Sequence, residues 1–215
     1  MKNVLVTGFE PFGGDTLNPS ALAVQALNGR QVAGRRVTGT VLPCAFGKSL
    51  AALREEIRRT QPELVICTGE AGGRGDLSLE RVAINIEDAS IPDNAGNQPV
   101  DHPVYRGGPA AYWSTLPVKA IVIALLKADL PAAISQSAGT FVCNHVFYGL
   151  MRMLARKRRV RGGFIHVPYL PEQARRAADG SPSLPLAEII RGLEIAIETS
   201  LTTPHDLRAV GGATC

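Results

Sequence analysis

The stretch Gly47–Thr68 reads GKSLAALREEIRRTQPELVICT, and its two halves have different hydrophobic periods. Up to Thr60 the apolar residues recur every three or four positions, which predicts an amphipathic helix over Gly47–Thr60. After Pro62 comes a short continuous apolar run, Leu64–Thr68, typical of a strand buried on both faces. A helix followed by such a strand is the repeating unit of an α/β fold.

The same alternation extends in both directions along the 215 residues. Further buried strands are predicted at Val4–Thr7, Val37–Leu42, Ala133–Ser137 and Phe164–Val167, and further helices at Pro19–Asn28, Val118–Ala128, Cys143–Arg158 and Leu186–Leu201. Strand–helix alternation predicts a mostly parallel, twisted sheet with helices on both faces, an α/β/α sandwich. The length suits one domain over residues 1–215.

One region, from Gly69 to Pro117, interrupts this rhythm. It holds a glycine-rich turn, a strand-like segment Leu79–Ile86, and two turn-rich stretches around Pro92 and Pro103. Almost 50 residues with little helix predict a β/loop excursion. Loops at the carboxyl ends of strands commonly carry function, so we expect part of the site here.

Composition and charge narrow the functional classes. Hydrophobic residues make up 45% of the chain and charged residues 20%, as in soluble globular proteins. The longest apolar stretch, Ala120–Leu126, is too short to cross a bilayer, and the N-terminus lacks a secretory signal, so a cytoplasmic protein is expected. The net charge is +4, but the main basic cluster, Arg152–Arg161, falls at a predicted helix end and has no interleaved aromatics. We therefore expect no nucleic-acid partner.

The four cysteines, Cys44, Cys67, Cys143 and Cys215, are far apart and form no CxxC pair, so neither a zinc site nor a disulfide framework is expected. Cys143 stands out because it follows a strand and the small-residue turn at Gly139, and opens a helix. A helix N-terminus stabilises a thiolate and offers free N–H groups to a developing oxyanion. The alternative is a cysteine packed in the core.

A cysteine nucleophile needs a base, usually a histidine that is distant in sequence. Of the four histidines, His102 and His205 lie in polar or Pro-rich stretches, and His145 leaves the predicted helix away from Cys143. His166 ends a strand in GGFIHVPY. If this strand adjoins the strand before Cys143, the two side chains meet at one sheet edge. His166 is therefore the candidate base.

A carboxylate commonly orients such an imidazole. The candidates in the irregular region are Glu70, Glu80, Glu87, Asp88 and Asp93, and position alone does not choose among them.

The loop after the first strand, Thr7–Gly14, reads TGFEPFGG and matches neither common phosphate-loop pattern. Phe9 and Phe12 would form a poor phosphate cradle and a good apolar wall. A hydrophobic plug over the sheet is the competing interpretation.

Together these segments resemble one family, the type I pyroglutamyl peptidases (pyrrolidone-carboxylate peptidases). The matching pieces, in family order, are GFEPFGG from Gly8, ERVAIN from Glu80, IPDN from Ile91, SAGTFVCN from Ser137 and GFIHVPY from Gly163. They span most of the chain, and the cysteine segment and the phenylalanine loop are the most specific.

The resemblance implies a cytosolic cysteine peptidase that removes an N-terminal pyroglutamyl residue from peptides through a thioester intermediate, without a metal or organic cofactor. It also implies an α/β sandwich and a homotetramer or homodimer. Its catalytic residues fall on Glu80, Cys143 and His166. Its apolar substrate slot falls on Phe9, Phe12, Phe141 and Val142.

Two positions depart from the family pattern. Ser90 stands where the family usually has arginine, which could reduce turnover if that arginine shapes the site. Glu70 precedes Ala-Gly-Gly-Arg, where many members have Gln or Leu. A carboxylate at position 70 could accept a hydrogen bond from the lactam N–H, or be a buried charge that needs a partner.

Two other functions remain open at this stage. A nucleoside phosphorylase-like transferase would need a phosphate site, for which Arg74 is the only plausible anchor. A pyroglutamyl-peptide binding protein without turnover would keep the slot but not the reaction, and the intact Glu80, Cys143 and His166 argue against it.

Overall fold

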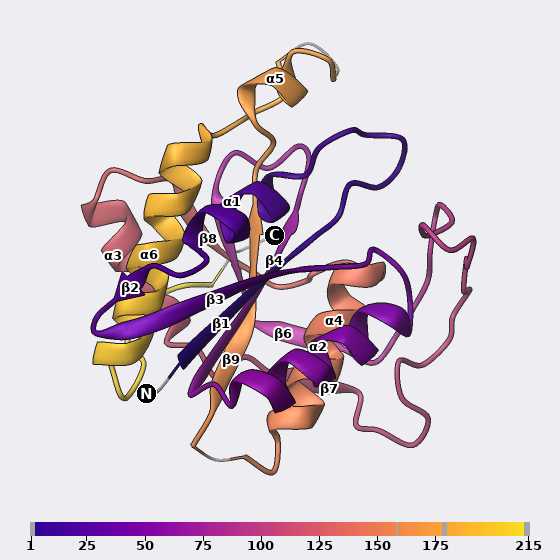
Figure 1. Ribbon diagram of the computed structural model, residues 1–215, viewed down its shortest axis with the longest axis horizontal. Coiled ribbons are helices and arrows are strands. Elements are labelled where there is room, and N and C mark those ends of the chain that lie inside the picture. Colours follow the sequence, from indigo (N-terminus) through magenta and orange to yellow (C-terminus); the bar gives the residue numbers. More distant parts are fainter. Residues whose placement is uncertain (1–2, 158, 178–179, 213–215) are drawn as a thin grey trace.

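A seven-stranded sheet forms the centre of the computed structural model, which describes residues 3–157, 159–177 and 180–212 (Figure 1). The strands are β1 (Asn3–Phe9), β2 (Gln31–Val32), β3 (Arg35–Leu42), β4 (Leu64–Glu70), β5 (Leu77–Glu80), β6 (Val82–Ile84), β7 (Ala111–Trp113), β8 (Ala132–Ser135) and β9 (Arg161–Val167). The helices are α1 (Pro19–Leu27), α2 (Lys48–Thr60), α3 (Val118–Lys127), α4 (Val142–Leu154), α5 (Pro171–Ala174) and α6 (Leu186–Thr202).

The strand order is β2-β3-β1-β4-β9-β5-β8, and a separate two-stranded sheet joins β6 to β7. Strands β3, β1, β4 and β9 are parallel to one another, whereas β5 runs antiparallel to β9 and parallel to β8. The predicted α/β class with a mostly parallel sheet is confirmed. The reversal between β9 and β5 was not predicted.

Helices cover both faces of the sheet, as predicted. Helices α1, α3 and α6 pack on one face and α2 and α4 on the other (Figure 1). Side chains that alternate along a strand point to opposite faces of the sheet and so belong to two separate hydrophobic cores. In β9, Ile165 and Val167 belong to the core under α1, α3 and α6, and Phe164 belongs to the core under α2 and α4. None of the helices in the described ranges has both the length and the apolar character required to span a membrane.

Three details differ from the sequence-based expectations. The strand-like segment 79–86 is two strands, because the chain changes partner at Arg81: β5 pairs with β9 and β8, and β6 pairs with β7. The helix expected to reach Arg158 ends at Leu154, its last buried apolar residue; Arg158 itself lies outside the described residues.

The third difference concerns the strand that carries His166. It does not adjoin the strand before Cys143, because β5 lies between β9 and β8. Strand β8 also runs opposite to β9, so the two do not end at one edge. Cys143 reaches His166 by another route, through the turn that follows β8 and the start of α4.

Candidate active site

A buried imidazole–carboxylate pair lies where β5 and β9 meet. Glu80, the last residue of β5, is opposite Phe164, so its side chain reaches His166 diagonally across the ladder. The distance from His166 Nδ1 to Glu80 Oε1 is 2.7 Å, and the two residues are 4% and 0% exposed. Because a carboxylate only accepts hydrogen bonds, Nδ1 carries the hydrogen and Nε2 is left as the basic nitrogen.

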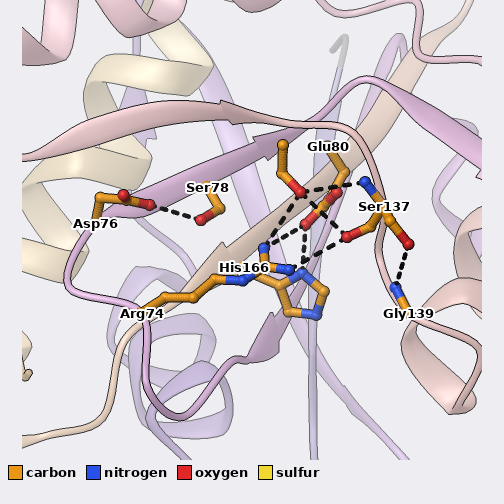
Figure 2. Close-up of polar contacts among 8 residues, drawn as sticks. Arg74, Asp76, Ser78, Glu80, Ser137, Gly139 and His166 are labelled. Atoms are coloured by element: carbon orange, nitrogen blue, oxygen red, sulfur yellow. Dashed lines mark hydrogen bonds and ion pairs between the residues drawn. The ribbon is translucent and has the colours of Figure 1, made fainter. Parts of the chain in front are cut away.

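Arg74 binds the same carboxylate oxygen, as Figure 2 shows. Its Nη1 donates to Glu80 Oε1 at 2.8 Å, and its Nη2 donates to the carbonyl oxygen of Ser137 at 3.2 Å. The guanidinium therefore ties the carboxylate to the turn that leads into α4. This commits Arg74 to Glu80 and leaves the phosphorylase-like alternative without its expected phosphate anchor.

Cys143 lies in the first turn of α4, directly over β4. A Cβ atom on Gly69 would come within 2.7 Å of Cys143 Sγ and within 2.9 Å of the Phe164 ring. Gly69 is also the register partner of His166 in the β4–β9 ladder. The absence of a side chain at Gly69 therefore lets the thiol settle beside the imidazole. The structure brings together Glu80, Cys143 and His166 from three separate elements.

The position of Cys143 at the start of α4 predicted a lowered pKa for its thiol, and the surroundings act in the opposite direction. Burial raises its pKa well above the ordinary value, and the charges of Glu80 and Glu70 add to this effect, while Arg74 opposes it. Desolvation thus outweighs the helix N-terminus. A thiol in this state needs a base to remove its proton, which is the role that His166 Nε2 offers. The N-cap residue Phe141 makes no side-chain cap, so the first-turn N–H groups remain for a substrate oxyanion.

The other described cysteines belong to the core. Cys67 is 0% exposed within β4 and Cys44 is 3% exposed, and burial raises the pKa of each to about 12. Both are free thiols, as is Cys143, and Cys215 lies outside the described residues. Across the described ranges, no group of three or more His, Cys, Asp and Glu side chains could hold a metal ion.

The predicted slot residues fall into two layers. Phe12 and Phe141 are partly exposed, with ring centroids 6.0 Å apart. Phe9 and Val142 are buried beneath them, and Phe9 packs on Phe164 at 6.5 Å. Phe12 and Phe141 are therefore positioned to touch a ligand, whereas Phe9 and Val142 shape the floor under it.

Glu70 ends β4 and is half-buried at the same edge of the sheet. Its Oε2 accepts a hydrogen bond of 2.6 Å from Gln173 Nε2, which also donates to Asp15 at 2.9 Å. Burial raises the pKa of Glu70 to about 7, the bond from Gln173 lowers it, and the charge of Asp15 raises it further. Beside this bridge is a cavity of about 350 Å³ lined by Gly13, Gly14, Asp15, Thr16, Tyr169, Gln173, Arg176 and Ala177.

Two other candidate carboxylates, Asp93 and Asp88, lie in loops and make hydrogen bonds there. Asp93 accepts from the N–H groups of Phe46, Ala95 and Asn97, and so holds two loops together. Asp88 is exposed, and its backbone bonds to Thr140.

Sequence reasoning missed a second His–Glu pair, between the buried His145 and the partly exposed Glu87. His145 was expected to point away from Cys143, and its side chain turns instead to Glu87: the residue is 5% exposed and its Nδ1 is 2.5 Å from Glu87 Oε1. Its helical spacing from the buried Val142 indicated burial, yet nothing local indicated a partner 58 positions away. His102 and His205 are exposed, as expected.

Comparisons with known proteins show which family the chain resembles. The sequence model of the family described as pyroglutamyl peptidase (Peptidase_C15) matches residues 2–203. The pyrrolidone-carboxylate peptidase of Erwinia tasmaniensis is 56% identical over 214 residues, covering 100% of each chain. That of Brevibacillus brevis is 54% identical and covers 99% of each. The crystal structure of pyroglutamyl peptidase I from Bacillus amyloliquefaciens superposes with a TM-score of 0.94 at 50% identity, covering 97% of this chain and 99% of that one.

Proposed function

The chain belongs to the pyroglutamyl peptidase family, and on that premise we propose that it hydrolyses the amide bond after an N-terminal pyroglutamyl residue of a peptide. One observation carries the proposal: the thiol of Cys143 lies over Gly69, beside an imidazole whose other nitrogen is held by the buried Glu80. A thiol, a base and an orienting carboxylate are the groups that cysteine peptidases use.

In the first half of the reaction, His166 Nε2 removes the proton from Cys143 Sγ as the sulfur attacks the pyroglutamyl carbonyl carbon. The carbonyl oxygen gains the charge and binds the first-turn N–H groups of α4. When the tetrahedral species collapses, the C–N bond breaks and the imidazolium gives its proton to the leaving amine. The products are a thioester on Cys143 and the shortened peptide.

In the second half, His166 removes a proton from water, and the hydroxyl oxygen attacks the thioester carbonyl carbon. The C–S bond then breaks, and the proton returns to the sulfur, which releases pyroglutamate and restores the thiol. Protein groups and water are enough for every step. The raised pKa of Cys143 makes the base indispensable, because little thiolate exists before the proton moves.

Substrate recognition in this proposal relies on the neutrality of the lactam. An apolar slot with a few directed polar groups suits such a ring, and Phe12 and Phe141 are partly exposed next to Cys143 while Phe9 and Val142 lie beneath them. Glu70 is the polar residue that we assign to the lactam N–H. With a pKa of about 7, its carboxyl group is partly ionised near neutral pH, and the ionised form is the stronger acceptor.

Further parts of the proposal concern the whole molecule. Residues 1–215 act as one catalytic domain, in a cytoplasmic enzyme that works as a homodimer or homotetramer. Its partners are peptides with N-terminal pyroglutamate, and neither nucleic acid nor a membrane takes part.

The test is release of a fluorescent amine from a pyroglutamyl amide, with and without an alkylating reagent, alongside Cys143→Ser. Release that both treatments abolish supports the proposal. Thermal stabilisation by pyroglutamyl peptide without any release would mean a binding protein, and phosphate-dependent nucleoside cleavage that survives Cys143→Ala would mean a transferase.

A further inference from the structure

The pair of the buried His145 and the partly exposed Glu87 has no part in the reaction described above, yet His145 lies close to the reacting residues in the chain. His145 follows Cys143 by two positions, so the two side chains leave α4 in different directions. The imidazole Nδ1 is 2.5 Å from Glu87 Oε1, and since the carboxylate accepts, Nδ1 carries the hydrogen. The ring is therefore held in one tautomer, with Nε2 as an acceptor.

The second nitrogen of His145 is also occupied. Gly47 N–H donates to Nε2 at 3.0 Å. Gly47 is the N-cap of α2, has a φ of 72°, and provides no side chain to cap its own helix. The imidazole thus fixes the backbone at the point where the loop 43–47 enters α2. With both nitrogens bonded, His145 is not free to act as an acid or base.

The residue fixed by this contact is Phe46. Its own N–H donates to Asp93 Oδ2 at 2.8 Å, so two successive N–H groups, those of Phe46 and Gly47, are held by buried acceptors. The Phe46 ring meets His145 edge to face, with centroids 5.4 Å apart at 79°. It meets Phe141 in the same way, at 5.4 Å and 89°.

This contact links the pair to the proposed slot. Phe141 immediately precedes α4 and stands between Phe12 and Phe46, at 6.0 Å and 5.4 Å respectively. Phe46 is itself partly exposed, like Phe12 and Phe141. The three rings form a continuous aromatic row, and only the Phe46 end depends on contacts from residues 87 and 145.

We infer that His145 and Glu87 are positioning residues that set Phe46 as the third aromatic wall of the pyroglutamyl slot, and so control affinity for the lactam ring and not the chemical step. The inference rests on the proposed function, since the slot is defined by its substrate. It adds Phe46 to the residues that determine ring specificity. It gives the second His–Glu pair a role through Gly47 and Phe46, without contact to the reacting atoms.

The test compares His145→Leu, His145→Gln and Phe46→Leu with the wild type, using a pyroglutamyl amide as substrate and 2-pyrrolidone, the bare lactam, as competitive inhibitor. His145→Leu and Phe46→Leu should each raise KM and the inhibition constant of 2-pyrrolidone by at least about tenfold, while kcat stays within about threefold. Gln can accept from Gly47 and donate to Glu87, so His145→Gln should recover most of the affinity. The double variant His145→Leu/Phe46→Leu should be no weaker than the worse single variant.

His102→Gln is the matched control, because His102 is exposed and only its backbone pairs with Glu87. It should match the wild type in KM. The inference is overturned if Phe46→Leu leaves the 2-pyrrolidone constant unchanged, or if His145→Gln or His145→Leu lowers kcat with KM intact. If His145→Leu does not fold, the KM and inhibition constants of Phe46→Leu and His145→Gln still test the inference. A wild type that releases no amine would instead refute the proposed function.

Discussion

The protein contains two His–Glu pairs built around buried imidazoles, and they differ in what meets the second ring nitrogen. His166 and His145 are 4% and 5% exposed, and each binds a glutamate through Nδ1, at 2.7 Å and 2.5 Å. Gly47 N–H occupies Nε2 of His145. No described residue donates a hydrogen bond to Nε2 of His166, which lies beside the thiol over Gly69. The difference teaches that a carboxylate orients a buried imidazole in either case, and that a free second nitrogen decides whether the imidazole can act as a base.

The largest expected effect comes from removing the group next to the free nitrogen. Cys143→Ala should lower kcat by at least about 10³-fold, because no other nucleophile lies at that position. The fold should persist, since alanine suits the first turn of a helix. Amine release measures the effect, and circular dichroism checks the fold. Cys67→Ala is the control and should stay active, because Cys67 is fully buried in β4. An inactive Cys67→Ala enzyme with a native spectrum would contradict the assignment.

Matched changes of the two carboxylates test the comparison directly. Glu80→Gln replaces an acceptor-only group with an amide that can disturb the imidazole tautomer, and kcat should fall by roughly 10²- to 10⁴-fold. Glu87→Gln should leave kcat within about threefold and act mainly on KM, because its imidazole does not touch the reacting atoms. Steady-state kinetics on both variants separate these outcomes. Equal losses of kcat would mean that the two pairs do not differ as described.

The two pairs also differ in Arg74, which binds Glu80 and has no counterpart at Glu87 among the described contacts. A hydrogen bond between charged groups contributes about 1.5–3 kcal/mol, so Arg74→Met should lower kcat by about tenfold or more. Arg74→Lys should retain more activity, because it keeps the charge but loses the second arm to Ser137. Steady-state kinetics on both variants measure the effect. Identical kcat values for Arg74→Lys and Arg74→Met would show that the positive charge at position 74 does not contribute to the rate.

The smallest expected effect concerns Glu70, a carboxylate with no imidazole partner. Its folded pKa is about 7, raised from 4.5, so the folded protein binds this proton more tightly than the unfolded chain between these values. Stability therefore falls as pH rises from about 4.5 to about 7. The variant Glu70→Gln has no carboxyl group at this position, so its stability should not fall in this way as the pH rises. Between pH 5 and pH 8 the melting temperature of the wild type should drop by several degrees relative to the variant, because this pKa shift corresponds to about 2 kcal/mol over that interval and each kcal/mol moves the melting temperature by about 2–4 °C at this size. Parallel melting curves would contradict the shifted pKa.

The type and position of a helix or strand were predictable where residues within that segment determine them. Buried apolar runs and helical spacing are local, so nearly every main element appeared at the expected position. Strand direction and order are not local, and the insertion of β5 between β9 and β8 left no mark in any single segment. The bond between Glu80 and His166 spans 86 positions, so the residue pattern alone left five carboxylates open, and only the family resemblance selected Glu80.

The electrostatics were harder to predict than the positions. A helix N-terminus is visible in a sequence, but the burial that raises the pKa of Cys143 depends on contacts such as the one with Gly69. Phe46 escaped notice for the same reason, and Glu87 was a candidate carboxylate without a predicted partner. Each is ordinary in its own segment and gains meaning from His145, which lies 58 positions after Glu87.

The position of β9 has a consequence for the order in which the enzyme matures. β9 lies between β4 and β5, which come much earlier in the chain, and its sixth residue is His166. During synthesis Cys143 and Glu80 leave the ribosome before the strand that carries His166. Until β9 enters, β4 and β5 have open edges towards the gap that it fills. Completion of the central sheet and assembly of the proposed active site are therefore the same event, so the proposed function predicts a growing chain without activity until that late strand is in place.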